Sequence, residues 1–562
     1  MRRKINMAAI KISSGFIIIT TLLSFLLLSN YVALAEIIEK PLLEKAKLFQ
    51  SLVRERAAKG FDITRALYLN KKSQEAAIEG DLALVNRLLD DAIKALSDLP
   101  EKPPKMSLIK RVVALPVRAD KAIVTEAVPK YKSGQEVKEY ETAFHTKTVT
   151  AKNGIVTLEI TSDPIYVEEG SVTPILKGRT EDSPFGFHPG YTYDTPVNRN
   201  KLVPPSKIGF NYKNSLDIGL RWNRPEFYFL WSIIQRTDSD VKEGVFDWKE
   251  NDYVYGNVPK NIGIVANIAG IESRVIRRDM PFPRAFAFKS KYLEEKYIHF
   301  VRKIVERYDG DGIDDMPSLK NPIRYWQVDN EPDVDTKDWK GYAHLMEISY
   351  KAIKESCPEC KVIVGGMAFP KEFEEFYLPI FKSFKGKYID VFDFHQFGPE
   401  WAWMGYKDFV DVIKKGLSEN GYDKVEIWIT ETGTYTERPV VPSLAPIMYL
   451  PEQTEKEQAC SLIKRYVYAL SLGVKKIFWA FGLVEGFTGT GNHEFDHTGL
   501  IYTRDTAKDK EMKKLAYYSY KLLTEKLEGC NFSKVERLKL GERIFAYKFN
   551  KLGKAIYVFW AE

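Results

Sequence analysis

Two glutamates in this sequence each follow a run of apolar, strand-forming residues, and a carboxylate at such a place can move protons or attack a substrate. Glu331 ends the run 324–331, within RYWQVDNEPD, and Glu431 ends the run 425–431, VEIWITE. Pro332 has no N–H to donate to a sheet, so the first run is expected to stop at Glu331. Two such carboxylates can supply a general acid/base and a nucleophile.

The spacing of similar runs predicts the fold that positions these glutamates. Short apolar runs alternate with amphipathic stretches of helical length, such as 291–308 and 455–472, which is the pattern of an α/β protein with a parallel sheet. Eight runs can be counted, at 185–188, 218–224, 263–268, 324–331, 361–365, 391–395, 425–431 and 475–481. We therefore predict a (β/α)8 TIM barrel over residues 183–528, in which all strands end at one mouth.

Asn330, Glu331 and Glu431 resemble the motifs of the clan A glycoside hydrolases, which are retaining enzymes on a (β/α)8 barrel. Members of the clan carry an Asn-Glu pair, often followed by Pro, at the end of strand four, and a Glu at the end of strand seven. The resemblance is nearest to the xylosidase and iduronidase family. It implies that Glu331 is the acid/base, that Asn330 binds the sugar 2-hydroxyl, that Glu431 is the nucleophile, and that no cofactor is needed. Strict alternation along a strand would point Asn330 and Glu331 to opposite faces, so both can serve only if the chain bends there.

The same resemblance implies three further substrate-site residues at strand ends. Arg224, in GLRWNR, resembles the arginine that steadies the nucleophile by a charge-assisted hydrogen bond, with Arg221 as the alternative. His395 ends the sixth run, where the clan often places a His or Tyr beside the nucleophile or the sugar; the alternative is a histidine satisfied by a loop carbonyl. Trp479, in IFWAF, matches the tryptophan under the sugar in the cleavage subsite, and its alternative is core packing.

Two other groups of residues lie in loops near the predicted mouth. Trp401 and Trp403, after the sixth run, are candidates for a further sugar subsite if they are exposed. A second group, after the eighth run, could be mistaken for metal ligands; it consists of His493, Glu494, Asp496 and His497. It has neither an HExxH spacing nor a third nearby histidine. We therefore expect no metal there, but a solvated loop or a lid that grips substrate.

Charge and the amino-terminal segment bear on partners and location. The chain has 83 basic and 76 acidic residues without a basic block beyond its amino terminus, which gives nucleic-acid binding little support. Basic residues at 2–4 precede an apolar stretch and the small residues Ala33 and Ala35, so residues 1–35 are expected to be a signal peptide of a secreted or cell-surface protein. The alternative is an uncleaved membrane anchor.

The rest of the chain is expected to form accessory domains. Residues 36–99 have helical periodicity with a candidate cap at Asp81, which predicts a helical bundle domain. Residues 105–175 and 530–562 alternate apolar and polar residues as strands do. Because a lone hairpin is marginally stable, we expect these two segments to share one small β-sandwich beside the barrel.

The four cysteines fit an exported protein. Cys357 and Cys360 form a CxxC without a second CxxC or a nearby histidine pair, which favours a local disulfide over a zinc site. Cys460 and Cys530 either pair with each other or stay as buried thiols.

Together these patterns predict a secreted retaining glycosidase that acts on a β-linked oligosaccharide or polysaccharide. Two alternatives are a glycan-binding protein without catalysis and a cell-surface scaffold organised by the helical domain. Hydrolysis of an activated aryl glycoside discriminates between the first reading and the glycan-binding alternative, whereas for a scaffold an active barrel would be incidental. Sugar and linkage specificity cannot be read from the sequence.

Overall fold

The structure is a computed structural model of the 562-residue chain. It describes residues 110–562 apart from 177–179, 194–203, 270–285, 335–336, 371, 438–451, 490–492 and 504–511. Before residue 110 it describes residues 81–99 and single positions or short stretches between 42 and 76. The predicted signal peptide lies outside the described residues. Among the described residues, no helix is both long and apolar enough to span a bilayer.

Eight parallel strands close into a barrel, so the predicted (β/α)8 architecture is confirmed. The strands are β6 (Phe185–His188), β9 (Trp222–Asn223), β11 (Gly263–Ala269), β12 (Tyr325–Val328), β13 (Lys361–Val364), β14 (Val391–Phe397), β15 (Glu426–Gly433) and β16 (Ile477–Ala480). Pairing of β16 with β6, of β6 with β9 and of β9 with β11 completes the circle. A short extra strand, β10 (Phe229–Leu230), pairs with the end of β11. Each predicted run overlaps one strand of the barrel.

An apolar layer fills the barrel interior and leaves the carboxyl ends of the strands to polar side chains. Six buried side chains from six strands form this layer: Trp222, Val265, Ile363, Val391, Trp428 and Phe478. Because the barrel is packed rather than hollow, any site has to be built where the strands end.

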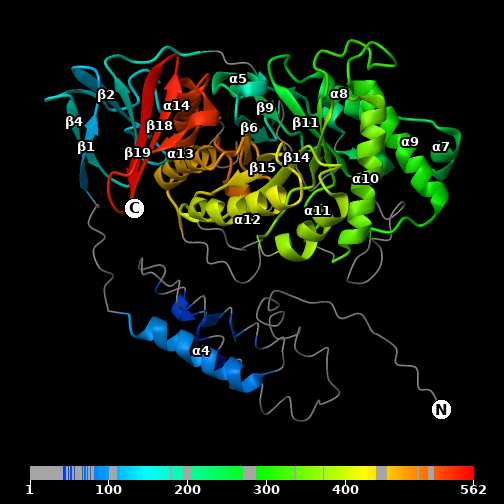
Figure 1. The fold of residues 1–562 in the computed structure, drawn as a ribbon, viewed down its shortest axis with the longest axis horizontal. Helices are drawn as coiled ribbons and strands as arrows, with labels where there is room; N and C mark the ends of the chain where they lie inside the picture. Colours follow the sequence, from blue (N-terminus) through cyan, green and yellow to red (C-terminus); the bar gives the residue numbers. More distant parts are fainter. Residues whose placement is uncertain are drawn as a thin grey trace. The chain divides into compact units, whose positions relative to one another are not determined.

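The helices lie outside the strands (Figure 1). The long ones are α9 (Lys291–Tyr308), α10 (Trp339–Ser356), α12 (Tyr406–Glu419), α13 (Glu455–Ser471) and α14 (Leu515–Leu527); shorter ones are α5 (Lys213–Asp217), α6 (Trp231–Ile234), α7 (Asp238–Glu243), α8 (Lys249–Gly256) and α11 (Leu378–Phe384). In α9 the buried residues Tyr297, Phe300, Val301 and Ile304 recur at helical spacing, which makes one apolar face for the strands. Thr454 and Glu457 form a capping box that starts α13.

The strands before and after the barrel share one antiparallel sheet. Its order is β17 (Glu536–Arg537), β18 (Ile544–Lys551), β19 (Lys554–Ala561), β5 (Ile165–Glu169), β2 (Lys121–Glu126) and β3 (Thr146–Thr150). A second sheet pairs β1 (Arg111–Pro116) with β4 (Ile155–Ile160). A separate apolar core joins the two sheets, with Val113, Leu158 and Phe559 among its buried members. Segments more than 350 residues apart in the sequence therefore build one sandwich.

The outer face of this sandwich packs on the barrel. Trp560 on β19 contacts Trp403 edge-on at a centroid distance of 5.4 Å, and Tyr547 on β18 contacts Tyr468 of α13 at 6.4 Å. Figure 1 shows β18 and β19 beside α13 and α14. The carboxyl-terminal strands therefore belong to the same apolar core as the barrel.

The amino-terminal unit is a separate body, and α4 (Leu82–Ser97) is its best-described element. Asp81 accepts a hydrogen bond from the Leu84 amide at 2.9 Å, which is the predicted cap. The helix buries Val85, Leu89, Ala92 and Leu96. Phe49, Val53 and Ala66 join Ala92 and Leu96 in one apolar cluster.

The cysteines separate into one disulfide and two thiols. Cys357 and Cys360 are bonded to each other after the end of α10, as predicted. Cys460 and Cys530 are buried free thiols, so the alternative of a second disulfide is wrong.

Candidate active site

Glu331 and Glu431 lie at the same end of the barrel and close together. One carboxylate oxygen of each, together with one ring nitrogen of His395, lie within 4.8 Å of one another. Glu431 belongs to β15 and is buried, whereas the Glu331 side chain is 29% exposed. One carboxylate is therefore enclosed and the other is open to an incoming molecule.

The chain after β12 bends so that Asn330 and Glu331 both reach the mouth. The strand stops at Val328, and Asp329 and Glu331 adopt positive φ angles of 68° and 45°. The Asp329 amide donates to the Ile268 carbonyl at 3.0 Å and the Glu331 amide to the Gly365 carbonyl at 2.6 Å. Non-glycine residues in this region are strained and cluster at functional sites. The chain therefore has the bend that Asn330 and Glu331 need if both are to face the mouth.

A register shift aims Glu431 inward. The pairing of β15 shifts between Asp393 and His395 on one side and between Ile429 and Thr432 on the other. Such irregularities re-aim side chains next to active sites. As a result Thr430 contacts His395, Glu431 reaches the mouth, and Thr432 points outward to Arg465 on α13.

Arg224 joins three side chains of the site. Its Nη1 donates to Glu431 Oε1 at 2.7 Å, its Nη2 to Asn330 Oδ1 at 2.6 Å, and its Nε to Gln327 Oε1 at 2.7 Å. The guanidinium is fully buried, and charge-assisted hydrogen bonds are the strong ones. Of the two candidate arginines, the structure places Arg224 on Glu431 and gives Arg221 no hydrogen bond from its buried Nε.

His395 stands between the two glutamates. Its Nδ1 lies 2.7 Å from Glu331 Oε1 and 3.6 Å from Glu431 Oε2. Burial disfavours the charged ring, but the Glu431 and Asp393 carboxylates outweigh burial and raise the pKa of His395 to about 10. The alternative of a histidine satisfied by a loop carbonyl is not what the structure has.

Opposing effects act on the pKa of Glu431. Burial raises the pKa of its carboxyl, while His395 and Arg224 act in the opposite direction. A buried carboxylate costs little only when it is paired and hydrogen-bonded, and the two cations supply that pairing.

Sequence reasoning missed four residues of the site. His188, at the end of β6, has Nδ1 2.7 Å from the Arg224 carbonyl and Nε2 3.5 Å from Glu431 Oε1. The Tyr228 ring lies under the Arg224 guanidinium at 5.2 Å. Gln327 and Asp393 are buried strand residues hydrogen-bonded to each other at 2.7 Å. The strand-end rule applied to the first run would have found His188; the other three have no such signal.

Trp479 does not line the site, so the expected stacking platform is wrong. It is fully buried and its indole N–H donates to the Thr498 carbonyl at 2.9 Å. It pairs in register with Thr432, whose side chain points outward, while its neighbour Phe478 belongs to the barrel interior. Because side chains alternate along a strand, Trp479 faces the helices, and core packing was the right reading.

Trp401 and Trp403 have different environments. Trp401 is 44% exposed and remains available to a ligand. Trp403 is fully buried, edge-on to Phe545 at 5.0 Å and to Trp560 of the sandwich. The expectation that Trp403 serves a sugar subsite is wrong, because the carboxyl-terminal strands cover it.

An aromatic wall stands at the mouth where a platform was expected. Phe481, just after β16, stacks on Phe487 at a centroid distance of 4.1 Å and on Phe397 at 5.1 Å. Its ring is edge-on to His188 at 5.6 Å, and His188 contacts Glu431. Phe481 is therefore, with Tyr228, an aromatic side chain close to the glutamates, which it approaches through His188.

A metal ion does not suit the glutamate cluster. The donor atoms of Glu331, His395 and Glu431 gather closely, but Arg224 and the raised pKa of His395 already place positive charge on these carboxylates. Another cation would be repelled. Within the described part of the chain, the loop residues His493, Glu494, Asp496 and His497 do not bring their ligand atoms together as a metal site requires. Asp496 instead accepts from the Thr488 hydroxyl at 2.5 Å.

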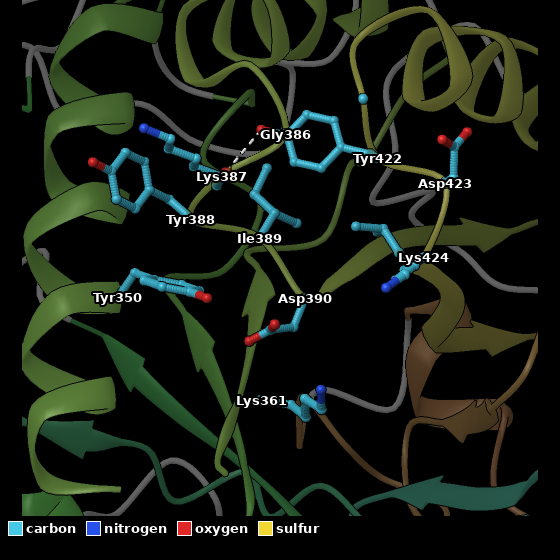
Figure 2. Close-up of a pocket in the computed structure, with 12 residues that line it drawn as sticks. Tyr350, Lys361, Gly386, Lys387, Tyr388, Ile389, Asp390, Tyr422, Asp423 and Lys424 are labelled. Atoms are coloured by element: carbon cyan, nitrogen blue, oxygen red, sulfur yellow. Dashed lines mark hydrogen bonds between the residues drawn. The ribbon is translucent and has the colours of Figure 1, made fainter. Parts of the chain in front are cut away.

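A described hollow lies elsewhere. It has a volume of about 600 Å³ and is lined by residues at the start of β13 and before β14 and β15, including Asp390, Tyr422 and Lys424 (Figure 2). These are the amino-terminal ends of the strands. In a barrel this end serves stability and the opposite end serves chemistry, so the convergent side chains, not the hollow, define the site.

No protein family profile matches the chain, and no curated protein matches its sequence. Solved structures with a similar arrangement include a glucosidase from Croceicoccus marinus (15% identity, TM-score 0.44, 68% of this chain and 77% of that one). Others are a monomeric β-xylosidase from Caulobacter crescentus CB15 (17%, 0.41, 67% and 74%) and a β-galactosidase from Marinomonas ef1 (12%, 0.38, 56% and 56%). The chain thus spans little more than half of the galactosidase.

Proposed function

We propose that the protein is a glycoside hydrolase that cleaves O-glycosidic bonds of a β-linked glycan with retention of configuration. Glu431 is the nucleophile and Glu331 the acid/base. Glu431 attacks the anomeric carbon while Glu331 protonates the leaving oxygen, and water assisted by Glu331 then hydrolyses the glycosyl ester. The amino-terminal segment fits export, so the activity is proposed to lie outside the cytoplasm.

The approach of the two glutamates carries this proposal. Retaining glycosidases hold their carboxyl groups about 5 to 5.5 Å apart, whereas inverting enzymes need about 6.5 to 9.5 Å to admit a water molecule. One oxygen of Glu331 and one of Glu431 lie within 4.8 Å of each other, which supports the first class over the second.

The environment of each glutamate suits its role. Glu431 is enclosed and held by Arg224, as an oriented nucleophile requires. Glu331 is partly exposed, as a group that meets both a leaving group and a water requires. Asn330 offers its amide nitrogen to a sugar hydroxyl, because its oxygen is occupied by Arg224.

A mechanism-based label tests this function. A panel of 2-deoxy-2-fluoro glycosides with dinitrophenyl leaving groups slows hydrolysis of the glycosyl-enzyme, so a retaining enzyme accumulates the covalent adduct. We expect mass spectrometry of the digested protein to find the sugar on the peptide that contains Glu431. An adduct on another residue would overturn the assignment. A protein that turns over no activated aryl glycoside would instead be the glycan-binding or scaffold protein of the alternative readings.

A further inference from the structure

Asp393 is a buried carboxylate that has no place in the reaction described so far. It lies on β14, two residues before His395, and is fully buried. Its Oδ1 accepts from the Thr430 amide at 2.8 Å, and its Oδ2 accepts from Gln327 Nε2 at 2.7 Å. The backbone N–H of Thr430 and the side-chain nitrogen of Gln327 can only donate. Asp393 is thus held as an acceptor on both oxygens.

The orientation of the Gln327 amide is fixed independently. Its oxygen accepts from Arg224 Nε at 2.7 Å and its nitrogen donates to the Val364 carbonyl at 3.1 Å. Arginine is a donor only and a carbonyl an acceptor only. The nitrogen therefore faces Asp393.

These contacts determine whether Nε2 of His395, the ring nitrogen that faces away from Glu331, carries a hydrogen. Thr430 Oγ1 lies 2.5 Å from Asp393 Oδ2, so its single hydrogen is donated to that acceptor. His395 Nε2 lies 3.1 Å from the same hydroxyl and 3.2 Å from Asp393 Oδ2. Both neighbours can only accept from the ring, so Nε2 carries a hydrogen. The ring cannot turn away, because it packs against Gly366, where an added Cβ would lie 2.3 Å from Nε2.

The near side of the ring then has two possible states. A neutral ring would leave Nδ1 as an acceptor 2.7 Å from Glu331 Oε1. A protonated Glu331 would then donate its proton in a hydrogen bond to the ring instead of to a leaving group. An imidazolium would instead donate to Oε1 and leave Oε2 to carry the proton toward a leaving group. Only the second state serves an acid catalyst.

We propose that Asp393 is a positioning residue that keeps His395 as an imidazolium, so that His395 donates to Glu331 Oε1 and reserves Oε2 for the transferred proton. This inference rests on the acid/base role proposed for Glu331. The charged groups around the ring agree with it: Asp393, Glu331 and Glu431 face it directly, and Arg224 and His188 lie beyond Glu431. The raised pKa of His395 has Glu431 and Asp393 as its main favourable causes.

The charge balance holds through the reaction. Before attack, Glu431 and Asp393 are negative and Arg224 and His395 positive. After attack, Glu431 is a neutral ester and Glu331 has become the carboxylate. The imidazolium therefore faces Asp393 and one further carboxylate at both stages, and loses no counter-charge when the ester forms.

Asp393→Asn removes the charge with almost no change of shape, and it replaces one of the two acceptor oxygens by an amide nitrogen. The pKa of His395 is expected to fall, because one of its two main favourable neighbours is lost. Where the ring is neutral, Nδ1 accepts the Glu331 proton and substrates with poor leaving groups react slowly. Lower pH restores the imidazolium and their rate.

Nitrogen-15 NMR of the histidine rings in the whole protein is the first test. His395 is assigned by the loss of its signal in His395→Gln. We expect an imidazolium in the unmodified protein from about pH 6 to about pH 9, and a titration within that range in Asp393→Asn. A neutral His395 ring in the unmodified protein at about pH 8 would overturn the proposal, even if the variant does not fold.

Kinetics of Asp393→Asn are the second test, with Asp390→Asn as the matched control. Asp390 precedes the same strand at the opposite end of the barrel, where it accepts from the Val362 amide at 2.9 Å and lines the hollow in Figure 2. At about pH 8 we expect Asp393→Asn to lose about tenfold or more in kcat/KM on alkyl glycosides, out of the about 10² to 10⁴ that general acids contribute. Dinitrophenyl glycosides, which need no acid, should change little, and Asp390→Asn should match the unmodified protein on both.

An equal loss on both substrate classes would contradict the positioning role. Failure of the proposed function is distinguishable, because the NMR titration does not depend on turnover. An Asp393-dependent imidazolium in a protein that cleaves no glycoside would overturn the glycosidase proposal and the catalytic purpose given to Asp393, while the hydrogen assignment on His395 would stand.

Discussion

The Arg224 guanidinium and the Glu431 carboxylate are joined across the mouth of the barrel, with 2.7 Å between Nη1 and Oε1. Arg224 directly follows β9, the second barrel strand, and Glu431 lies near the end of β15, the seventh. Both side chains are almost completely enclosed, so their attraction is weakly screened by water and salt. The pair also ties Glu431 to Asn330 and Gln327, which share the same guanidinium.

Arg224→Lys is expected to weaken catalysis and shift its pH dependence. A lysine carries the charge but cannot donate to three partners at once. Loss of a hydrogen bond to a charged group costs about 1.5 to 3 kcal/mol, so kcat/KM should fall about 10- to 100-fold. Burial raises the pKa of Glu431 and Arg224 opposes that rise. Since Glu431 must be ionised to attack, the acidic limb of kcat/KM should move to higher pH.

Arg221→Lys is the control for this shift. Arg221 lies three residues away, and its Nε makes no hydrogen bond. Its pH profile should match that of the unmodified protein. An unchanged acidic limb in Arg224→Lys would show that Arg224 does not support ionised Glu431.

The two aromatic residues near the end of β16 should fail in different ways. Trp479→Ala empties a fully buried site and should destabilise the protein by about 3 to 5 kcal/mol. Phe481→Ala also truncates a buried ring and should cost some stability, but it opens the wall beside His188 and should in addition lower kcat/KM. Urea denaturation and steady-state kinetics measure the two effects. If Trp479→Ala stayed fully stable and lost turnover, Trp479 would be the platform after all.

Trp401 and Trp403 make a similar pair in the loop after β14. Trp403→Ala removes a ring packed against Trp560 and should lower stability by about 3 to 5 kcal/mol. Trp401→Ala changes an exposed ring and should leave the urea midpoint nearly unchanged while raising KM for long oligosaccharides more than for aryl monoglycosides. Equal KM values for both substrate lengths would remove Trp401 from any sugar subsite.

The barrel and its two glutamates were predictable because local signals carry them. Each strand is a short apolar run between helices, and Glu331 and Glu431 stand where those runs stop. The register of the last strands was not predictable. An irregular pairing of β15 with its neighbours turns Glu431 inward, and Trp479 lies buried on the helix side of β16.

Contacts over long sequence distances were also beyond the sequence. Trp403 is buried because β19, about 150 residues later, covers it. Asp393 and Gln327 look like ordinary strand residues. Asp393 is a near neighbour of His395 on β14, but only the barrel brings Gln327 to Asp393 and to Arg224. A buried polar network has no periodicity, so local patterns do not reveal it.

Alanine at each glutamate gives the sharpest test of the assigned roles, because one glutamate forms a covalent bond and the other only moves protons. Glu431→Ala should be inactive on every substrate, since no leaving group replaces a missing nucleophile. Glu331→Ala should keep much of its glycosylation rate on a dinitrophenyl glycoside and lose natural glycans, by about the 10² to 10⁴ that a general acid contributes. Its slow deglycosylation should give a burst of dinitrophenolate, and azide should speed turnover to a glycosyl azide of retained configuration. If Glu331→Ala lost the same factor on both substrates, or if azide rescued Glu431→Ala to a product of retained configuration, the two roles would be wrongly assigned.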